Sequence, residues 1–259
     1  MTGPISLPLM RRTWRAQRSR VALVCLALAA WTFLMPVIYA TFGRELAVLL
    51  DTGIIPDAFL RLMGADPFSL DGAVALGWVH PIGIGMFVLF PVGLGAVAIA
   101  GERQRGTLEV LLSRPLSRRS LFATHLLTLV LIAVLTTLAA LAGIVAGAAA
   151  YGVAGELDAG ALAFLAVNTV ALLTALAAVS LAASASFDRL AAPVGIGIAV
   201  LLLGYVLEIL GTLWPDAAFL QPLSPFHYLS PLDVLAGRGS ASDVAVLAGI
   251  AAVATAYGL

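Results

Sequence analysis

The sequence contains no lysine and little charge of either sign. Its 259 residues include 14 basic residues, and every one of them is arginine. A phosphate-binding P-loop needs a lysine that reaches the β- and γ-phosphates. No such loop can therefore form within these residues, and any ATP hydrolysis that powers the chain would take place in a separate polypeptide. Because 14 acidic residues balance the basic ones, there is no basic surplus for binding nucleic acid.

Cysteine and histidine are scarce as well. Cys25 is the single cysteine, which excludes an intrachain disulfide and a cysteine-based metal site. The three histidines, His80, His125 and His227, fall on separate segments, so we predict no metal site. An intramembrane protease or lipid transferase would need paired acids, a Ser-Lys dyad or clustered histidines. The chain offers none of these patterns, and we predict that it is not an enzyme and holds no cofactor of its own.

Apolar sequence, by contrast, dominates the chain. Charged residues make up 11% and apolar residues 61% of it, and the mean hydropathy is +1.06, whereas a soluble domain is about a quarter charged. An apolar window of about 20 residues is long enough to cross a bilayer. Six such windows predict an all-α polytopic membrane protein with a single transmembrane domain over 1–259. The predicted spans are 21–42, 81–100, 121–150, 161–183, 193–214 and 243–259.

The arginines indicate how these spans are oriented. Eleven of the 14 lie before the first span, after the second or after the fourth. Cytoplasmic loops carry the excess of basic residues. We therefore expect the N-terminus and the loop 101–120 to be cytoplasmic, and the loops 43–80 and 215–242 to lie outside. The last span ends at Leu259 without a basic tail, and we expect the chain to continue there.

Residues 5–20, before the first span, combine apolar and basic side chains. Leu7, Met10 and Trp14 recur at helical spacing, with arginines on the remaining positions. This pattern predicts an elbow helix that lies in the membrane interface and leads into the first span. An irregular basic tail held by anionic lipid is the alternative.

The outer loop 43–80 is long, and Phe219 to Leu235 in the other outer loop is rich in proline and aromatic residues. The apolar pieces Ala58 to Met63 and Leu70 to Leu76 predict one or two small helices at the outer interface. The aromatic side chains considered as interfacial anchors are Trp78, Trp214, Phe226 and Tyr228. They serve either as anchors of an aromatic belt or as parts of lids over a substrate path, and the sequence leaves both readings open.

A few polar or small residues interrupt the spans. A carboxylate in the bilayer is costly, which makes Glu208 a candidate for a substrate or proton path, although it also lies near enough to the outer end to reach the interface. Asn168 is either a second candidate on that path or a helix–helix hydrogen-bonding group. The small residues Gly143 and Gly147 form a G-x-x-x-G pair that predicts close helix packing within the chain.

The segment from Gly101 to Phe122, GERQRGTLEVLLSRPLSRRSLF, is a charged cassette between two apolar spans. Its residues 102–112 predict a short amphipathic helix. Leu108, Leu111 and Leu112 form the apolar stripe, charged residues occupy the neighbouring face, and Pro115 ends the helix. Such a helix could press its leucines on the span ends and present its charges to a cytoplasmic partner. Alternatively, the charges only set the topology.

This cassette resembles the first cytoplasmic loop of type-2 ABC exporter permeases, E-x-x-x-G-T-L-E-x-L-L-x-x-P-[VL]-S-R. The matching residues are Glu102, Gly106, Thr107, Leu108, Glu109, Leu111, Leu112, Pro115, Leu116, Ser117 and Arg118. The stretch from Leu223 to Tyr228, LSPFHY, is similar to an element that precedes the final span in members of this family.

The resemblance implies that the chain is the permease subunit of an ATP-driven exporter in the cytoplasmic membrane of a bacterium or archaeon. ATP and Mg²⁺ would then bind to a separate ATPase subunit, and a second permease, identical or related, would complete the pathway. The cassette would act as the coupling helix that contacts the ATPase. The implied contact residues are Glu102, Arg103, Arg105, Gly106, Thr107, Leu108, Glu109 and Leu112. A membrane scaffold that transports nothing is the alternative.

Overall fold

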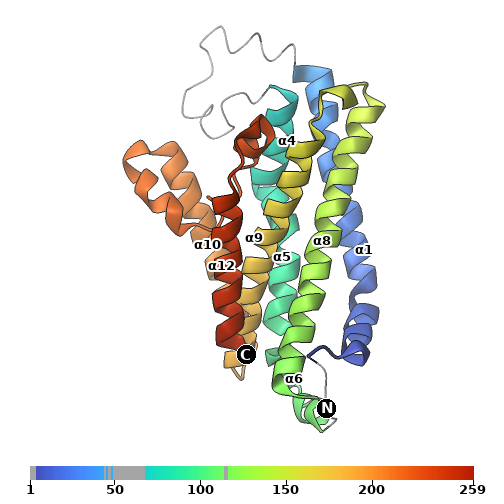
Figure 1. Cartoon of the computed structure of the whole chain (residues 1–259), viewed down its shortest axis with the longest axis vertical. Coiled ribbons are helices and arrows are strands. Elements are labelled where there is room, and N and C mark those ends of the chain that lie inside the picture. Colours follow the sequence, from blue (N-terminus) through green and yellow to red (C-terminus); the bar gives the residue numbers. More distant parts are fainter. Residues whose placement is uncertain (1–3, 44, 46–47, 49–67, 114–115) are drawn as a thin grey trace.

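The computed structural model describes residues 4–43, 45, 48, 68–113 and 116–259. These residues form helices and turns, with no strand among them. Five helices are long and apolar enough to cross a membrane, and they run side by side along one axis (Figure 1). They are α1 (Leu7–Ile38), α8 (Arg118–Ala150), α9 (Ala159–Ser186), α10 (Ala191–Leu213) and α12 (Ala241–Gly258). The expected fold class, an all-α polytopic membrane protein, is confirmed.

A bent pair of helices makes up the sixth candidate span. Helices α4 (Leu70–Val79) and α5 (Pro81–Val97) meet at an angle of 48° and together are long enough to cross the membrane. The break occurs at His80, whose backbone is extended with φ −61° and ψ 138°. A proline disfavours helical backbone in the residue before it, and Pro81 therefore separates the two helices.

Helix α4 is not the interfacial helix that the sequence predicted for Leu70 to Leu76. It packs inside the bundle against α1, and the Trp78 side chain is 1% exposed. The Trp78 indole nitrogen donates a hydrogen bond of 2.9 Å to Thr169 Oγ1 on α9. Phe226 is also buried, whereas Trp214 is 62% exposed. Trp78 and Phe226 are thus core residues and not belt anchors. The second predicted outer helix, Ala58 to Met63, lies outside the described residues.

The prediction of a separate elbow helix at residues 5–20 is also wrong. Helix α1 continues from Leu7 to Ile38 without a break. Between Pro8 and Pro36 it contains neither glycine nor proline, and arginine, glutamine, alanine and leucine are good helix formers. At 1.5 Å per residue the helix is about 48 Å long, so its arginine-bearing first turns extend beyond a ~30 Å hydrocarbon layer.

Helices α1 and α8 are in close backbone contact. An added Cβ at Gly143 would collide with the carbonyl oxygen of Ala29, and one at Gly147 with that of Phe33. Between these points Thr32 Oγ1 donates a hydrogen bond of 2.7 Å to the Ala140 carbonyl oxygen. The predicted use of the glycine pair, close packing within the chain, is confirmed.

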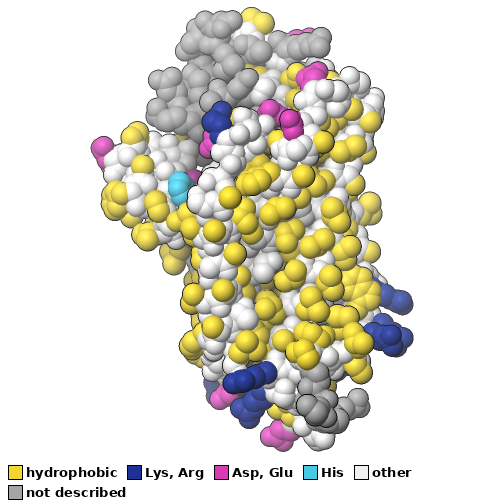
Figure 2. Space-filling model, viewed as in Figure 1, with side chains coloured by type: hydrophobic (Ala, Val, Ile, Leu, Met, Phe, Trp, Pro, Cys, Tyr) yellow, Lys and Arg dark blue, Asp and Glu magenta, His cyan; other side chains and the backbone are white. Residues whose placement is uncertain are grey.

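Short helical elements close the two ends of the bundle. At one end lie α6 (Ala100–Gln104) and α7 (Leu108–Leu112). The other end carries η1 (Tyr39–Gly43), η2 (Ala154–Glu156), η3 (Pro215–Leu223), α11 (Pro231–Asp233) and η4 (Val234–Arg238). Helix α1 begins and α12 finishes at the α6 end (Figure 1). On the face in Figure 2, arginines gather mainly at this end, acidic side chains mainly at the other, and the flank between them is largely apolar.

Candidate functional site

The cassette begins where α5 stops, and α9 holds this junction in place. The hydroxyl oxygen of Ser184 on α9 accepts hydrogen bonds from the backbone N–H groups of Ile99 (3.0 Å) and Ala100 (2.9 Å). These N–H groups open helix α6, where the first turn has no intrahelical acceptors of its own. The start of the cassette is therefore fixed to both α5 and α9.

A turn at Gly106 divides the cassette into two short helices, so the single helix predicted for 102–112 is wrong. The N–H of Thr107 donates to the Glu102 carbonyl (2.9 Å) and that of Gly106 to the Arg103 carbonyl (3.0 Å). This is the Schellman pattern that ends a helix. Gly106 has φ +69°, a conformation that only glycine adopts without strain. Pro115, the predicted helix terminator, lies outside the described residues.

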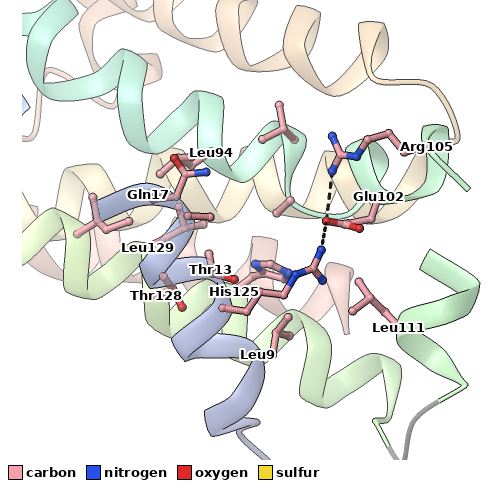
Figure 3. A pocket seen from close by; sticks show the side chains of 15 residues that line it. Leu9, Thr13, Gln17, Leu94, Glu102, Arg105, Leu111, His125, Thr128 and Leu129 are labelled. Carbon is pink, nitrogen blue, oxygen red and sulfur yellow. Dashed lines mark hydrogen bonds and ion pairs between the residues drawn. The ribbon is translucent and has the colours of Figure 1, made fainter. Parts of the chain in front are cut away.

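Glu102 is the electrostatic centre of this turn (Figure 3). Its Oε1 lies 3.3 Å from Arg12 Nη2 on α1 and 3.2 Å from Arg105 Nη2, and its side chain is 15% exposed. Thr107 Oγ1 donates a hydrogen bond to Oε2. Burial on its own would raise the pKa of Glu102, but the Thr107 hydrogen bond and the two guanidinium groups together lower it below its ordinary value. The carboxylate is therefore ionised at neutral pH and links the turn to α1.

A cavity of about 140 Å³ lies behind this network, between α1, α5 and α8. Its walls include Leu9, Gln17, Leu94 and His125 (Figure 3). His125 is 9% exposed, and its Nε2 has no hydrogen-bond partner among the described residues.

Arg103 faces the bundle and ties the cassette to the loop after α9. Its Nη1 donates to the Phe187 carbonyl at 2.7 Å and its Nη2 to the Ala185 carbonyl at 3.2 Å. These carbonyls belong to the end of α9, where basic side chains commonly satisfy the last acceptors. Gln104 Oε1 accepts from the Leu190 N–H at 2.9 Å. The cassette and residues 187–190 thus form one connected surface.

Helix α7 has the two faces that the sequence predicted. Leu108 and Leu112 are half-buried against a core cluster that includes Leu121 and Phe122. On the opposite side Glu109 is exposed and Val110 is 64% exposed. We call the exposed residues within 102–113 the docking surface; they are Gln104, Arg105, Gly106, Glu109, Val110 and Ser113.

At the other end of the bundle, Glu208 on α10 lines a cavity of about 640 Å³. The walls come from α4, α5, α10 and the segment 226–233. Glu208 Oε1 accepts a hydrogen bond of 3.1 Å from Gln221 Nε2. Its Oε2 is buried without a hydrogen-bond partner among the residues that the structure describes, and it lies 3.7 Å from His227 Nδ1, which is beyond hydrogen-bonding distance.

Asn168 does not line that cavity. It is fully buried on α9, and its Nδ2 donates to the carbonyl oxygens of Tyr228 (2.9 Å) and Leu229 (2.8 Å). Asn168 therefore fixes the LSPFHY segment to the bundle, and that segment in turn supplies a wall of the cavity. The two residues predicted for a substrate path are not brought together, and Asn168 has the hydrogen-bonding role.

A family model described as "ABC-2 family transporter protein" matches residues 16–259. The chain belongs to the ABC-2 transporter family. No curated protein and no solved structure matches it. The ABC-2 permease is thus an integral membrane protein and the membrane subunit of a transporter, and its family implies association with an ABC ATPase subunit.

The cassette lies within the matched part of the permease, and its predicted contact residues divide into two groups. Arg105, Gly106 and Glu109 reach the docking surface, whereas the other five, from Glu102 to Leu112, are at least half-buried or bonded within the chain. Sequence reasoning missed Val110, although its place on the free face of α7 was a usable signal. It also missed Arg12 and Ser184, which lie about 90 and 85 residues from their partners and carry no local signal.

Proposed function

We propose that this permease is the membrane-spanning subunit of an ATP-driven exporter and that its docking surface seats on a separate ATPase subunit. One observation carries this proposal: the cassette that exposes Glu109 and Val110 is bonded at its base to α1 through Arg12 and to α9 through Ser184. Movement of an ATPase seated on this surface would therefore be passed to two long helices directly. It would also reach α5, which leads into the cassette.

The arginine distribution supports a cytoplasmic position for the docking surface. Ten arginines of the described residues lie on the first turns of α1, on the cassette, at the start of α8 and in the loop after α9, whereas Arg238 lies at the opposite end. By the positive-inside rule, both the N-terminus and the cassette face the cytoplasm. The membrane in this proposal is the cytoplasmic membrane of a bacterium or archaeon.

A second permease, identical or related, completes the proposed transporter. The apolar windows of α10 and α12 are only 22% and 11% buried within the chain. Their outer faces are therefore available to lipid and to another permease. ATP and Mg²⁺ bind to the ATPase subunits in this proposal, and the permease supplies the path across the membrane.

Co-purification tests this proposal. The tagged permease is extracted gently from its native membrane, and the recovered proteins are identified and assayed for vanadate-sensitive ATP hydrolysis. We expect a P-loop ATPase in stoichiometric amount. Glu109→Arg should lower its recovery about tenfold or more, because the substitution reverses a charge in the middle of the docking surface. The matched control Asp216→Arg makes the same change on the opposite end and should leave recovery unchanged.

Gly106→Ala gives a second test of the docking surface. An added Cβ at this glycine meets no atom within 4 Å, so the substitution causes no collision. It forces alanine into a left-handed conformation that costs about 1–2 kcal/mol, and we expect a several-fold loss of coupled transport with the spans still folded. Normal coupling in both Gly106→Ala and Glu109→Arg, or the absence of any ATPase in mild detergents, would overturn the docking assignment.

A further inference from the structure

The cavity around Glu208 has the dimensions of a ligand site. Its volume of about 640 Å³ lies within the range of pockets that hold drug-sized molecules. Much of the wall is apolar and comes from helices on either side of the α4–α5 break and from α10, for example Leu76, Ile84 and Ile209. Phe226 of the LSPFHY segment and Leu229, directly after it, close the cavity, and Asn168 holds this part of the chain in place.

The hydroxyl groups on the wall already donate to the protein. The Tyr205 hydroxyl donates to the Val79 carbonyl (3.4 Å) and the Thr212 hydroxyl to the Glu208 carbonyl (2.9 Å). Ser230 Oγ donates to the His227 carbonyl at 2.8 Å. An anionic ligand needs free donors, and these three residues offer it none.

Glu208, in contrast to these hydroxyl groups, is a hydrogen-bond acceptor that the protein satisfies only in part. Gln221 satisfies one carboxylate oxygen, while the other has no hydrogen-bond partner among the described residues, with His227 Nδ1 at 3.7 Å. The second acidic residue of the wall, Asp233, is paired with Arg238 at 2.7 Å. Among the described residues, Glu208 is thus a carboxylate without a guanidinium partner on a wall that is mostly apolar. A carboxylate within the bilayer is costly unless a cation or a strong donor meets it.

We propose that this cavity binds an amphiphile with one protonated amine, whose N–H donates to the Glu208 carboxylate, on a side chain that is 26% exposed, while its apolar body fills the space between α4, α5 and α10. If the cavity lies on the transport path, the amphiphile is the class of cargo, and that part of the inference rests on the proposed function. Binding itself needs no ATPase. A lipid with an amine headgroup and a freely diffusing lipophilic amine share this chemistry.

Equilibrium binding to the purified full-length permease tests the proposal. The permease is placed in phosphatidylcholine nanodiscs, because this headgroup has no N–H donor. The probe is monodansylcadaverine, a fluorescent primary amine, and the matched probe is its N-acetyl derivative, which has the same body without the charge. Anisotropy of the dansyl group reports the bound fraction. We expect the amine to bind at least about tenfold more tightly than the acetylated probe, as a charge-assisted hydrogen bond predicts.

Three variants distinguish the effect of the Glu208 charge on probe binding from the effect of cavity volume and from the effect of an unrelated substitution. Glu208→Gln should remove the preference for the amine and leave the acetylated probe unaffected. Leu76→Trp, which fills the cavity, should weaken both probes. Asp216→Asn removes an exposed acidic group from η3 and should change neither. The comparison of the two probes on the unaltered permease needs no variant, so a folding defect in Glu208→Gln does not decide the outcome.

Two results would overturn the proposal: equal affinity for the two probes, or an unchanged preference in a folded Glu208→Gln variant. Addition of phosphatidylethanolamine to the nanodiscs then identifies the source of the ligand. Displacement of the amine probe supports a lipid, and its retention supports a freely diffusing amphiphile. If the amine probe shows no preference but an ATPase co-purifies, the binding site is wrong and the proposed function stands. If the amine probe binds as expected but no ATPase co-purifies, the binding site stands and the proposed function is contradicted.

Discussion

Glu102 shows how one side chain can connect a surface turn to the body of a transporter. It accepts from Thr107 within the cassette and pairs with Arg12 on α1, 90 residues away in the chain. The Thr107 bond closes the turn, and the Arg12 pair joins it to the first long helix. The motif residues Glu102, Gly106 and Thr107 therefore belong to one helix-ending turn. Glu102 accepts its hydrogen bond, Gly106 supplies the left-handed backbone, and Thr107 donates.

The lowered pKa of Glu102 predicts a pH-dependent contribution to stability. Because its pKa is lower in the folded chain than in the unfolded one, the contribution is complete above the unfolded value of about 4.3. It is lost as the pH falls through the folded value. We expect Glu102→Gln to unfold about 1–3 °C below the unaltered permease at pH 7, with the difference shrinking as the pH is lowered to 3.

Thermal unfolding in detergent measures this difference. The matched control is Glu109→Gln, which makes the same substitution at an exposed residue with no ion pair among those described. It should behave as the unaltered chain at both pH values. A Glu102→Gln difference that persists undiminished at pH 3 would show that the residue acts through packing and not through its charge.

At the scale of helices, small residues decide how closely the elements approach. Gly143 and Gly147 let α8 lie against the α1 backbone, and Thr32 adds a hydrogen bond across the contact. Proline acts in the opposite way, since Pro81 separates α4 from α5 at His80. The first feature stabilises the bundle on one side, and the second opens a bend beside the Glu208 cavity.

Gly147→Ala should destabilise the permease because the new methyl group meets the Phe33 carbonyl oxygen. Overpacking of this kind costs about 1–3 kcal/mol, which corresponds to a fall in Tm of several degrees for a domain of this size. Gly249→Ala on α12 is the matched control, since its added Cβ meets no atom within 4 Å. Equal Tm values for the two variants would contradict the tight α1–α8 contact.

At the scale of the whole molecule, charge separates the two ends of the bundle while its flank is apolar (Figure 2). The start of α1 and the end of α12 lie at the same end, as expected for six potential spans (Figure 1). The arginines favour the proposed orientation, with the docking surface in the cytoplasm. In that orientation the Glu208 cavity lies in the outer half of the membrane.

Cysteine labelling in intact cells tests this orientation. After Cys25→Ala, a single cysteine is introduced at Asp216 or at Ser117, both of which are exposed. An impermeant maleimide should label Asp216→Cys from outside and should label Ser117→Cys only after the cells are permeabilised. The reverse pattern would mean that the arginine-rich end faces outward and that the proposed ATPase contact is impossible.

Composition and apolar runs alone determined the membrane class, because a span needs only enough consecutive apolar residues to cross the bilayer. They also placed α5, α8, α9, α10 and α12 to within about three residues at each end, whereas α1 begins at Leu7, well before the predicted span 21–42. The cassette motif led to the transporter family. The exposed and half-buried faces of α7 were predictable as well, since helical spacing depends on local sequence only.

Tertiary structure decided the features that depend on distant partners. The burial of Trp78 requires Thr169 on another helix, and the cassette is held by Arg12, 90 residues before Glu102, and Ser184, 85 residues after Ile99. Glu208 looked like an isolated polar residue until the fold placed it on a cavity built from four segments. Local sequence does not determine these long-range contacts, because they arise from the packing of whole helices against one another.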